Sequence, residues 1–346
     1  MKVAVFYGKE DIRIEERPIP TAGPNQLVVK IDYCGVCGTD VESYVTGNVI
    51  PPVIVLGHEN IATIVEIGEG VSGYALGQRI LCGPPDRCAE NCPPCQHGDT
   101  NICTTGFPRT NGIGGPDGGY AEYMLIPDVA HTILVPVPEN VDPQQAVLFD
   151  VVCVSLHALR ISRFRFGDDV VVSGAGPIGM AAIQLLKAAG ANRIIALGTS
   201  PDKFPLLTAY GADYCIDANA CKDVPAEVKR LLGKDVGADL CFECAGNNPS
   251  LVNCVYAARP GGQVLMIGQG GEPMTLVPAR FSIFEIDLQP TFVYTREEVQ
   301  MYLDMLASGK IAFPDMVTSI ISLDDCVEKG IVNRRGQRKV LIDPSL

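Results

Sequence analysis

The chain has 346 residues, of which 47% are hydrophobic and 19% are charged. This length predicts two domains, and the composition is typical of globular rather than disordered proteins. The 27 basic and 40 acidic side chains give a formal net charge of −13. Nucleic acids and anionic membranes bind basic surfaces, so this balance argues against both as partners.

The sequence shows neither a secretory signal nor an apolar run of ~20 residues, so we expect a cytoplasmic protein. It contains 14 cysteines. In a reducing compartment cysteines serve as free thiols or metal ligands more often than as disulfides. Metal binding is therefore the first function to consider for them.

Short apolar runs separated by Gly and Pro fill residues 1–127 and predict an all-β unit. The expected strands are residues 3–7, 26–33, 61–67, 79–82 and 120–126. Helical character begins at residues 142–146, where Asp142 is the expected N-cap and Pro143 the first helical residue.

Two turns of this unit carry side chains that bind metals. Cys37 opens the run Cys-Gly-Thr-Asp, and His58 and Glu59 follow a glycine. Thiolate, imidazole and carboxylate are donors that a catalytic Zn²⁺ takes. Asp150 lies in the apolar run 146–154, where a carboxylate must be paired, hydrogen-bonded or metal-bound, and it is the expected third ligand with Cys37 and His58. The alternative is a buried core cysteine and an ordinary loop histidine.

A second set of cysteines lies in a loop rich in Pro, Gly and Asn, with the spacing C-x₃-C-x₂-C-x₇-C: Cys88, Cys92, Cys95 and Cys103. Such a loop buries little apolar surface, and a closed four-thiolate zinc site would hold its shape. Cys82 ends an apolar run and is left out of this set. Free thiols or two disulfides are the alternatives.

A second domain is expected from residue 151. A strand over residues 169–173 leads into a G-x-G-x-x-G turn and a helix over 178–189. Glycines let a pyrophosphate approach the backbone at the helix N-terminus. The candidate dinucleotide-binding residues of this turn are Gly174, Gly176, Pro177, Ile178 and Gly179. Strands then alternate with helices up to residue 267, which predicts a doubly wound, parallel α/β sheet.

The end of the second strand of this domain bears on the choice between NADP and NAD. NAD enzymes place an Asp or Glu there to bind the ribose 2′-hydroxyl. This chain has Gly198, followed by Thr199, Ser200 and Lys203. Two hydroxyls and a lysine suit a 2′-phosphate, so the sequence favours NADP slightly over NAD. The remaining candidate cofactor-binding residues are Ala245 and Ile267.

Past residue 289 the chain is expected to return to the first domain. Residues 295–298 form a capping box that opens a helix, and two short strands follow at 317–321 and 339–342. The predicted domains are residues 1–150, completed by 290–346, and residues 151–289.

These motifs resemble those of the zinc-containing medium-chain dehydrogenase/reductases, most of all the polyol (sorbitol or iditol) and threonine dehydrogenases. The resemblance covers almost the whole chain. It rests on the cysteine loop and on residues 37–40, 57–59, 118–123, 154–158, 174–179 and 339–342. It implies a GroES-like all-β catalytic domain split around a Rossmann domain, one catalytic and one structural zinc per chain, and a homodimer or homotetramer.

The resemblance and the ligand set together predict hydride transfer between a secondary alcohol and NAD(P). Zinc lowers the pKa of the substrate hydroxyl. Thr39 is expected to accept its proton and to pass it outward through Glu42 or a cofactor ribose. Because Cys37 and Asp150 already neutralise Zn²⁺, Glu59 is expected to bind the metal at rest and to leave when substrate binds.

Two alternatives remain open. An L-threonine or other amino-alcohol dehydrogenase would share most of these motifs, although Glu42 stands where that group usually has histidine. A non-catalytic dinucleotide-binding protein on the same scaffold would not need Cys37, His58 and Asp150. The motifs do not determine the substrate, since the polyol enzymes carry an Arg-Tyr pair where this chain has Val293 and Tyr294.

Overall fold

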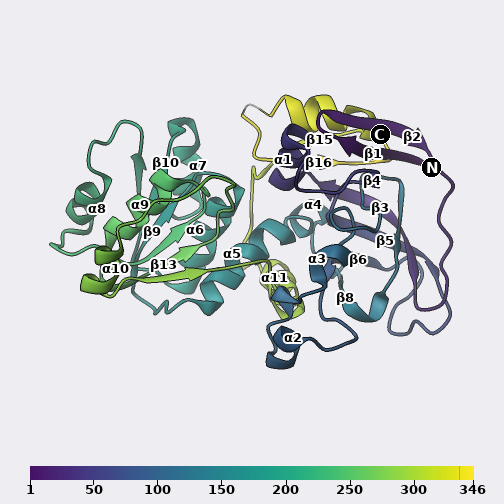
Figure 1. Cartoon of the computed structure of the whole chain (residues 1–346), viewed down its shortest axis with the longest axis horizontal. Helices are drawn as coiled ribbons and strands as arrows, with labels where there is room; N and C mark the ends of the chain where they lie inside the picture. Colours follow the sequence, from purple (N-terminus) through teal and green to yellow (C-terminus); the bar gives the residue numbers. More distant parts are fainter. Residues whose placement is uncertain (335) are drawn as a thin grey trace. The chain divides into compact units, whose positions relative to one another are not determined.

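A computed structural model describes residues 1–334 and 336–346. The chain divides into two compact units, one of Met1–Asp150 with Thr295–Leu346 and the other of Val151–Tyr294 (Figure 1). We expected the return to the first unit at residue 290, and the structure has it at Thr295. β14 (Asp287–Pro290) pairs in parallel with β13 (Ala258–Met266) of the second unit, and beyond it the Thr291 amide still donates to the Met266 carbonyl at 3.0 Å.

The first unit is an all-β body built from two sheets. One has seven strands in the order β15-β16-β3-β5-β6-β8, with β7 paired to β3, and the other has three strands in the order β2-β1-β4. The strands are β1 (Lys2–Gly8), β2 (Asp11–Glu16), β3 (Leu27–Gly35), β4 (Ile54–Val55), β5 (Glu59–Ile67), β6 (Arg79–Pro85), β7 (Tyr123–Ile126), β8 (Thr132–Pro136), β15 (Val317–Ile321) and β16 (Lys339–Ile342). Buried side chains of these strands form one hydrophobic core.

Short helices connect these strands. They are α1 (Gly38–Thr46), α2 (Pro93–His97), α3 (Gly106–Arg109), α4 (Pro143–Ala146), α11 (Arg296–Ala307), the 3₁₀ turns η1 (Thr100–Ile102), η2 (Val129–His131) and η4 (Leu323–Asp325), and the π-helix η5 (Cys326–Val332). As the sequence predicts, the Asp142 side chain caps α4, and Thr295 and Glu298 form a capping box on α11.

The second unit is a parallel sheet of six strands in the order β11-β10-β9-β12-β13-β14. In chain order this is 3-2-1-4-5-6, the order of a doubly wound dinucleotide-binding fold. Its remaining strands are β9 (Asp169–Ser173), β10 (Arg193–Gly198), β11 (Tyr214–Asp217) and β12 (Ala238–Glu243). Its helices are α5 (Phe149–Ile161, which starts in the first unit), α6 (Pro177–Ala189), α7 (Phe204–Ala209), α8 (Val224–Leu232), α9 (Asn248–Ala257) and α10 (Pro278–Phe284), with the 3₁₀ turn η3 (Pro201–Lys203). The predicted fold class is confirmed.

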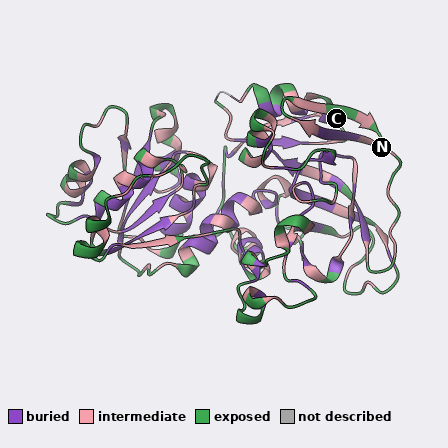
Figure 2. Cartoon of the chain, in the orientation of Figure 1, coloured by how far each residue is buried: buried purple, intermediate pink, exposed green. Residues whose placement is uncertain are grey.

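Consecutive residues of β9 face opposite sides of this sheet. Val171 packs with Val228 of α8 and Leu251 and Val255 of α9 in one hydrophobic cluster. The sheet strands are buried, and exposed residues lie on the outer sides of the helices (Figure 2). The near-continuous apolar runs that predicted these strands are therefore explained by helices covering the sheet.

Several elements were not predicted from the sequence, namely β2, β4, β8, β14, α1, α2, α3 and α10; residues 38–46, expected as a turn, form the helix α1. β14 reads Asp-Leu-Gln-Pro, which has no apolar run and ends in proline. Its parallel pairing with β13 comes from tertiary structure rather than from local preference. Among the described residues, every helix is too short or too polar to cross a lipid bilayer.

Gln145 of α4 ties the returning C-terminal segment to the first unit. Its Nε2 donates to the Phe313 carbonyl at 3.2 Å, and its Oε1 accepts from the Phe313 amide at 2.7 Å. A net contribution of about 0.5–1.5 kcal/mol per hydrogen bond predicts that Gln145→Ala lowers the free energy of unfolding by about 1–3 kcal/mol. Urea unfolding followed by circular dichroism measures this. Gln300→Ala, which removes an exposed bond to Asp304, is the matched control, and equal losses in the two variants would contradict the assignment.

Candidate active site

Cys37 is held where β3 ends and α1 begins. It is the N-cap of α1, and its backbone amide donates to the Asp40 carboxylate at 2.9 Å. The amide of Thr39 donates to the Cys37 sulfur at 3.5 Å. This capping box keeps the Cys37 sulfur at the N-terminus of α1.

Two glycines make room for the next candidate ligands. Gly57, directly before His58, has a φ of 96°, and a Cβ there would lie 2.7 Å from the Cys34 sulfur and 2.9 Å from the Tyr120 nitrogen. Only glycine fits both that backbone conformation and that space. Gly35 of β3 pairs with Glu59 of β5, and a Cβ at Gly35 would overlap the Glu59 Oε2.

Cys37, His58, Glu59 and Asp150 each bring a ligand atom within 4.8 Å of the others. Asp150 comes from the first turn of α5, far along the chain from the other three. The structure therefore brings together the four side chains that the sequence predicts as catalytic zinc ligands. A thiolate, an imidazole and carboxylates form a donor set that fits Zn²⁺.

The surrounding charges favour a cation. Burial alone would lower the pKa of His58, but the negative charges of Cys37 and Asp40 raise it well above its usual value. Burial likewise opposes the charge of Lys339, yet Glu59, Cys37 and Asp150 raise its pKa. A site that draws positive charge onto two buried side chains is suited to a divalent metal ion.

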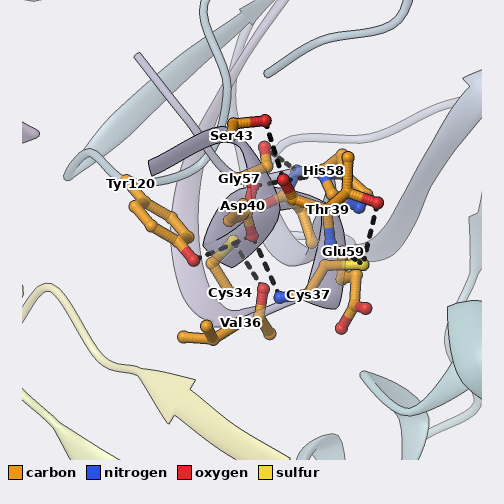
Figure 3. Close-up of polar contacts among 12 residues, drawn as sticks. Cys34, Val36, Cys37, Thr39, Asp40, Ser43, Gly57, His58, Glu59 and Tyr120 are labelled. Carbon is orange, nitrogen blue, oxygen red and sulfur yellow. Dashed lines mark hydrogen bonds and ion pairs between the residues drawn. The ribbon is translucent and has the colours of Figure 1, made fainter. Parts of the chain in front are cut away.

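Asp40 orients the histidine, and the sequence analysis gave it no role. The carboxylate is fully buried, with Oδ1 3.6 Å from His58 Nδ1 and Oδ2 accepting from the Tyr120 hydroxyl at 3.0 Å (Figure 3). With Nδ1 facing Asp40, the Nε2 atom is left for a metal. Asp40 and Tyr120 both lie in motifs that carry the family resemblance, and this was the available signal.

Lys339 is the second residue that the sequence analysis missed. From the sequence alone it is an ordinary residue of the last strand. Its ammonium is buried, forms an ion pair with the Glu59 carboxylate, and donates to the Val36 carbonyl at 3.3 Å. A buried lysine is rare unless it is paired, and a lone Lys in an apolar strand was the clue.

Thr39 and Glu42 lie on α1, directly after the Cys37 cap. The Thr39 hydroxyl is 3.6 Å from the Cys37 sulfur, so it stands beside the candidate metal ligands (Figure 3). Glu42 is exposed one turn later on the same helix. Their expected roles in proton transfer stay predictions.

The cysteine loop also closes on itself. Cys88, Cys92, Cys95 and Cys103 bring their sulfurs within 4.8 Å of one another, and Cys82 is instead buried in the core of the β unit. Hydrogen bonds from the Thr104 side chain and the Cys95 amide lower the pKa of Cys92 to about 6. Four thiols that converge in this way form a ligand set that suits a structural Zn²⁺.

Arg109 links this loop to the rest of the first unit through hydrogen bonds and an ion pair. Its guanidinium donates to the carbonyls of Thr105 and Arg87 at 3.1 and 3.0 Å and to the Cys103 sulfur at 3.8 Å. It also lies 3.5 Å from the Asp128 carboxylate. One cation thus links both ends of the loop to the body of the first unit.

The candidate dinucleotide-binding residues gather at one edge of the six-stranded sheet. They follow the carboxyl ends of β9, β10, β12 and β13, which are neighbours in the sheet. Gly174 has a φ of 128°, and Gly176 is the N-cap of α6. A Cβ at Gly179 would overlap the Gly174 carbonyl, so only glycine permits the close approach of helix and strand.

This edge contains all the residues proposed for the cofactor. Gly174, Gly176, Pro177, Ile178 and Gly179 follow β9, Gly198 ends β10 and Thr199, Ser200 and Lys203 follow it, Ala245 follows β12 and Ile267 follows β13. Parallel doubly wound sheets bind their ligands at this edge, beside the switch in strand order, which here lies between β9 and β12.

Asp40→Asn should weaken zinc binding at the Cys37 site by about 10- to 100-fold, because the imidazole loses the charge that orients it. Competition with a chromogenic chelator measures this, and the site is identified by its loss in Cys37→Ser. Asp32→Asn, which removes a carboxylate bonded to Arg79 and Thr63 in the same unit, is the matched control. Equal zinc affinity in both variants and the unaltered protein would show that Asp40 does not orient His58.

Comparison with known proteins gives an independent view of the chain. A family model of the alcohol dehydrogenase GroES-like domain matches residues 23–139, and one of the zinc-binding dehydrogenases matches residues 177–308. The (R,R)-butanediol dehydrogenase of Neisseria gonorrhoeae is 30% identical, with both chains covered completely. The D-xylulose reductase A of Aspergillus oryzae is 26% identical over 93% of this chain and 90% of that relative.

Solved structures give the same result. A protein of Sinorhizobium meliloti 1021, described as a zinc-binding dehydrogenase and bound to NADP, is 30% identical with a TM-score of 0.90 over 99% of both chains. The 2R,3R-butanediol dehydrogenase of Bacillus subtilis is 29% identical with a TM-score of 0.89 over 99% of both chains. Similarity of this extent places the chain in the zinc-containing medium-chain dehydrogenase/reductases, as a zinc-dependent oxidoreductase of alcohols.

Proposed function

We propose that this enzyme oxidises a secondary hydroxyl of a small diol or polyol, and reduces the corresponding ketone, with NADP as the preferred cofactor. The observation that carries the proposal is the convergence of Cys37, His58, Glu59 and Asp150 on one point of the first unit. The relatives named for butanediol cover the whole chain, and another relative is named for xylulose. These names support a substrate with neighbouring hydroxyls.

Residues of this chain would bind the metal and transfer the proton. Cys37, His58 and Asp150 would hold a zinc ion, with Glu59 as a further ligand. A zinc ion bound there acts as a Lewis acid that makes the alcohol hydroxyl more acidic. The Thr39 hydroxyl would accept the released proton. Glu42 lies three residues later on the same face of α1 and is exposed. Its carboxylate would carry the proton to solvent.

NADP is favoured by the end of β10. Gly198 ends this strand where an NAD enzyme has a carboxylate, and Thr199, Ser200 and Lys203 follow it. Asp202 is exposed in the same 3₁₀ turn, four residues past the strand end, so the preference is expected to be modest. The NADP bound to the Sinorhizobium meliloti structure supports the same choice.

A substrate panel tests this proposal. Zinc-loaded protein is mixed with 2,3-butanediol, several sugar alcohols and L-threonine, each with NADP and with NAD, and the absorbance of reduced nicotinamide is followed. We expect the highest kcat/KM with a diol or polyol and NADP, and no activity in Cys37→Ser. A preference for L-threonine would instead establish an amino-alcohol dehydrogenase, and a strong preference for NAD would refute the cofactor assignment.

We also propose a homo-oligomer in the cytoplasm. β14 ends the six-stranded sheet, so one of its edges is unpaired within the described chain. The preceding α10 exposes Ile283, which is 72% exposed, together with Phe284. Sedimentation velocity should give at least twice the monomer mass, and Ile283→Lys should shift the population toward monomer. A monomer at micromolar concentration in the unaltered protein would contradict this.

A further inference from the structure

A buried carboxylate without a cation lies at the cofactor edge of the second unit. Glu243 ends β12, and its side chain is fully buried. Among the described residues, no lysine, arginine or histidine forms an ion pair with Glu243, and its Oε2 atom has no hydrogen-bond partner. Buried carboxylates are normally paired with a positive charge, because a lone charge inside a protein is costly. Glu243 departs from that rule.

Every hydrogen bond of this side chain is one that Oε1 accepts. The amides of Ala245 and Gly246 donate to it at 2.8 and 2.9 Å, and the Ser250 hydroxyl donates at 2.6 Å. Ala245 and Gly246 precede α9, and Ser250 lies in its first turn. An ionised carboxylate accepts hydrogen bonds and donates none, and both these donors and the amino end of a helix suit a negative charge. Neutral groups thus hold Glu243 as an anion.

Glu243 also joins the loops that form this edge. Its backbone carbonyl accepts from the amides of Ile267 and Gly268, both at 2.9 Å, and these residues follow β13. The residue opposite Glu243 on β9 is Ser173, whose hydroxyl oxygen is 2.8 Å from that of Ser250. The charge is therefore fixed where β9, β12 and β13 end, next to residues that are candidates for cofactor binding.

The place of β12 in the sheet indicates which part of the cofactor lies nearest to this charge. A doubly wound sheet consists of two halves that each bind one mononucleotide of a dinucleotide. The half made of β9, β10 and β11 is the one assigned above to the adenosine 2′-phosphate, so the half made of β12, β13 and β14 is left for the nicotinamide nucleotide. Glu243 ends the first strand of this second half.

We propose that the buried charge of Glu243 makes the site favour the oxidised cofactor relative to the reduced one. This inference rests on the cofactor assignment proposed above. The nicotinamide ring is positively charged in NADP⁺ and neutral in NADPH, so a fixed anion in this half of the sheet attracts one form and not the other. Because the carboxylate is shielded from water, its attraction is stronger than that of a surface charge at the same distance.

Glu243→Gln removes the charge and keeps the side-chain shape and an oxygen for the three donors. Dissociation constants of NADP⁺ and NADPH are measured by titration calorimetry with the zinc-loaded protein. We expect the affinity for NADP⁺ to fall by about tenfold relative to that for NADPH. Disordered loops would weaken both forms equally, and repulsion of the cofactor phosphates is the same for both. The ratio of the two constants therefore reports the effect of the charge on the ring.

Glu227→Gln is the matched control. Glu227 lies on α8 of the same unit, and its carboxylate forms an ion pair with Arg230 at the surface. The same change of residue type there removes a charge that water and Arg230 already screen. The ratio of the NADP⁺ and NADPH constants should stay as in the unaltered protein.

A second pair of variants tests the same charge effect without altering the buried side chain. Ala245 is exposed two residues beyond Glu243. Ala245→Asp adds a negative charge to this loop, and Ala245→Asn adds a side chain of nearly the same size without the charge. The Asp variant should favour NADP⁺ over NADPH several-fold more than the Asn variant does.

The outcomes distinguish the inference from the proposed function. An unchanged ratio in a folded Glu243→Gln protein would overturn the inference and leave the proposed function intact. If Glu243→Gln does not fold, equal ratios in the two Ala245 variants would overturn it instead. If the unaltered protein binds NAD but not NADP, the NADP assignment fails, and the same ratios are measured with NAD⁺ and NADH, whose rings carry the same charges. A protein that binds neither dinucleotide would refute the cofactor assignment and the inference with it.

Discussion

Negative charge buried where β3, β5 and β16 meet imposes the main requirement on the first unit. The Cys37 side chain and the carboxylates of Glu59 and Asp40 are brought there by a helix cap, a glycine turn and a glycine in the neighbouring strand. Such charges are tolerated inside a protein only when opposite charges and hydrogen bonds accompany them. Lys339 meets part of that need and a metal ion bound there would meet the rest, so the C-terminal strand contributes to the site as well as closing the fold.

The cysteine loop also brings potential metal ligands together. Four sulfurs converge in a segment with little hydrophobic core of its own, and Arg109 joins it to the body of the unit. In the second unit the requirement is steric instead. Gly174 and Gly179 let a helix begin immediately against a strand, which leaves amide groups at the sheet edge for an anionic cofactor.

Local signals carried most of the sequence analysis. The strand at 169–173 and those at 317–321 and 339–342 have the predicted bounds, as do the caps at Asp142 and Thr295, because each depends on a few neighbouring residues. β14 was missed because its pairing is with a distant strand. Lys339 was missed for the same reason. Its partner lies on another strand, and only the order β16-β3-β5 and the small residue at Gly35 bring the two charges together.

The position of the metal tests this account most directly. Diffraction data from crystals of the zinc-loaded protein, collected on both sides of the zinc absorption edge, locate zinc by its anomalous scattering. The account predicts one strong peak bonded to Cys37, His58 and Asp150, near Glu59, and a second among Cys88, Cys92, Cys95 and Cys103. A map with no zinc beside Cys37, while the four-cysteine loop is filled, would contradict the central claim.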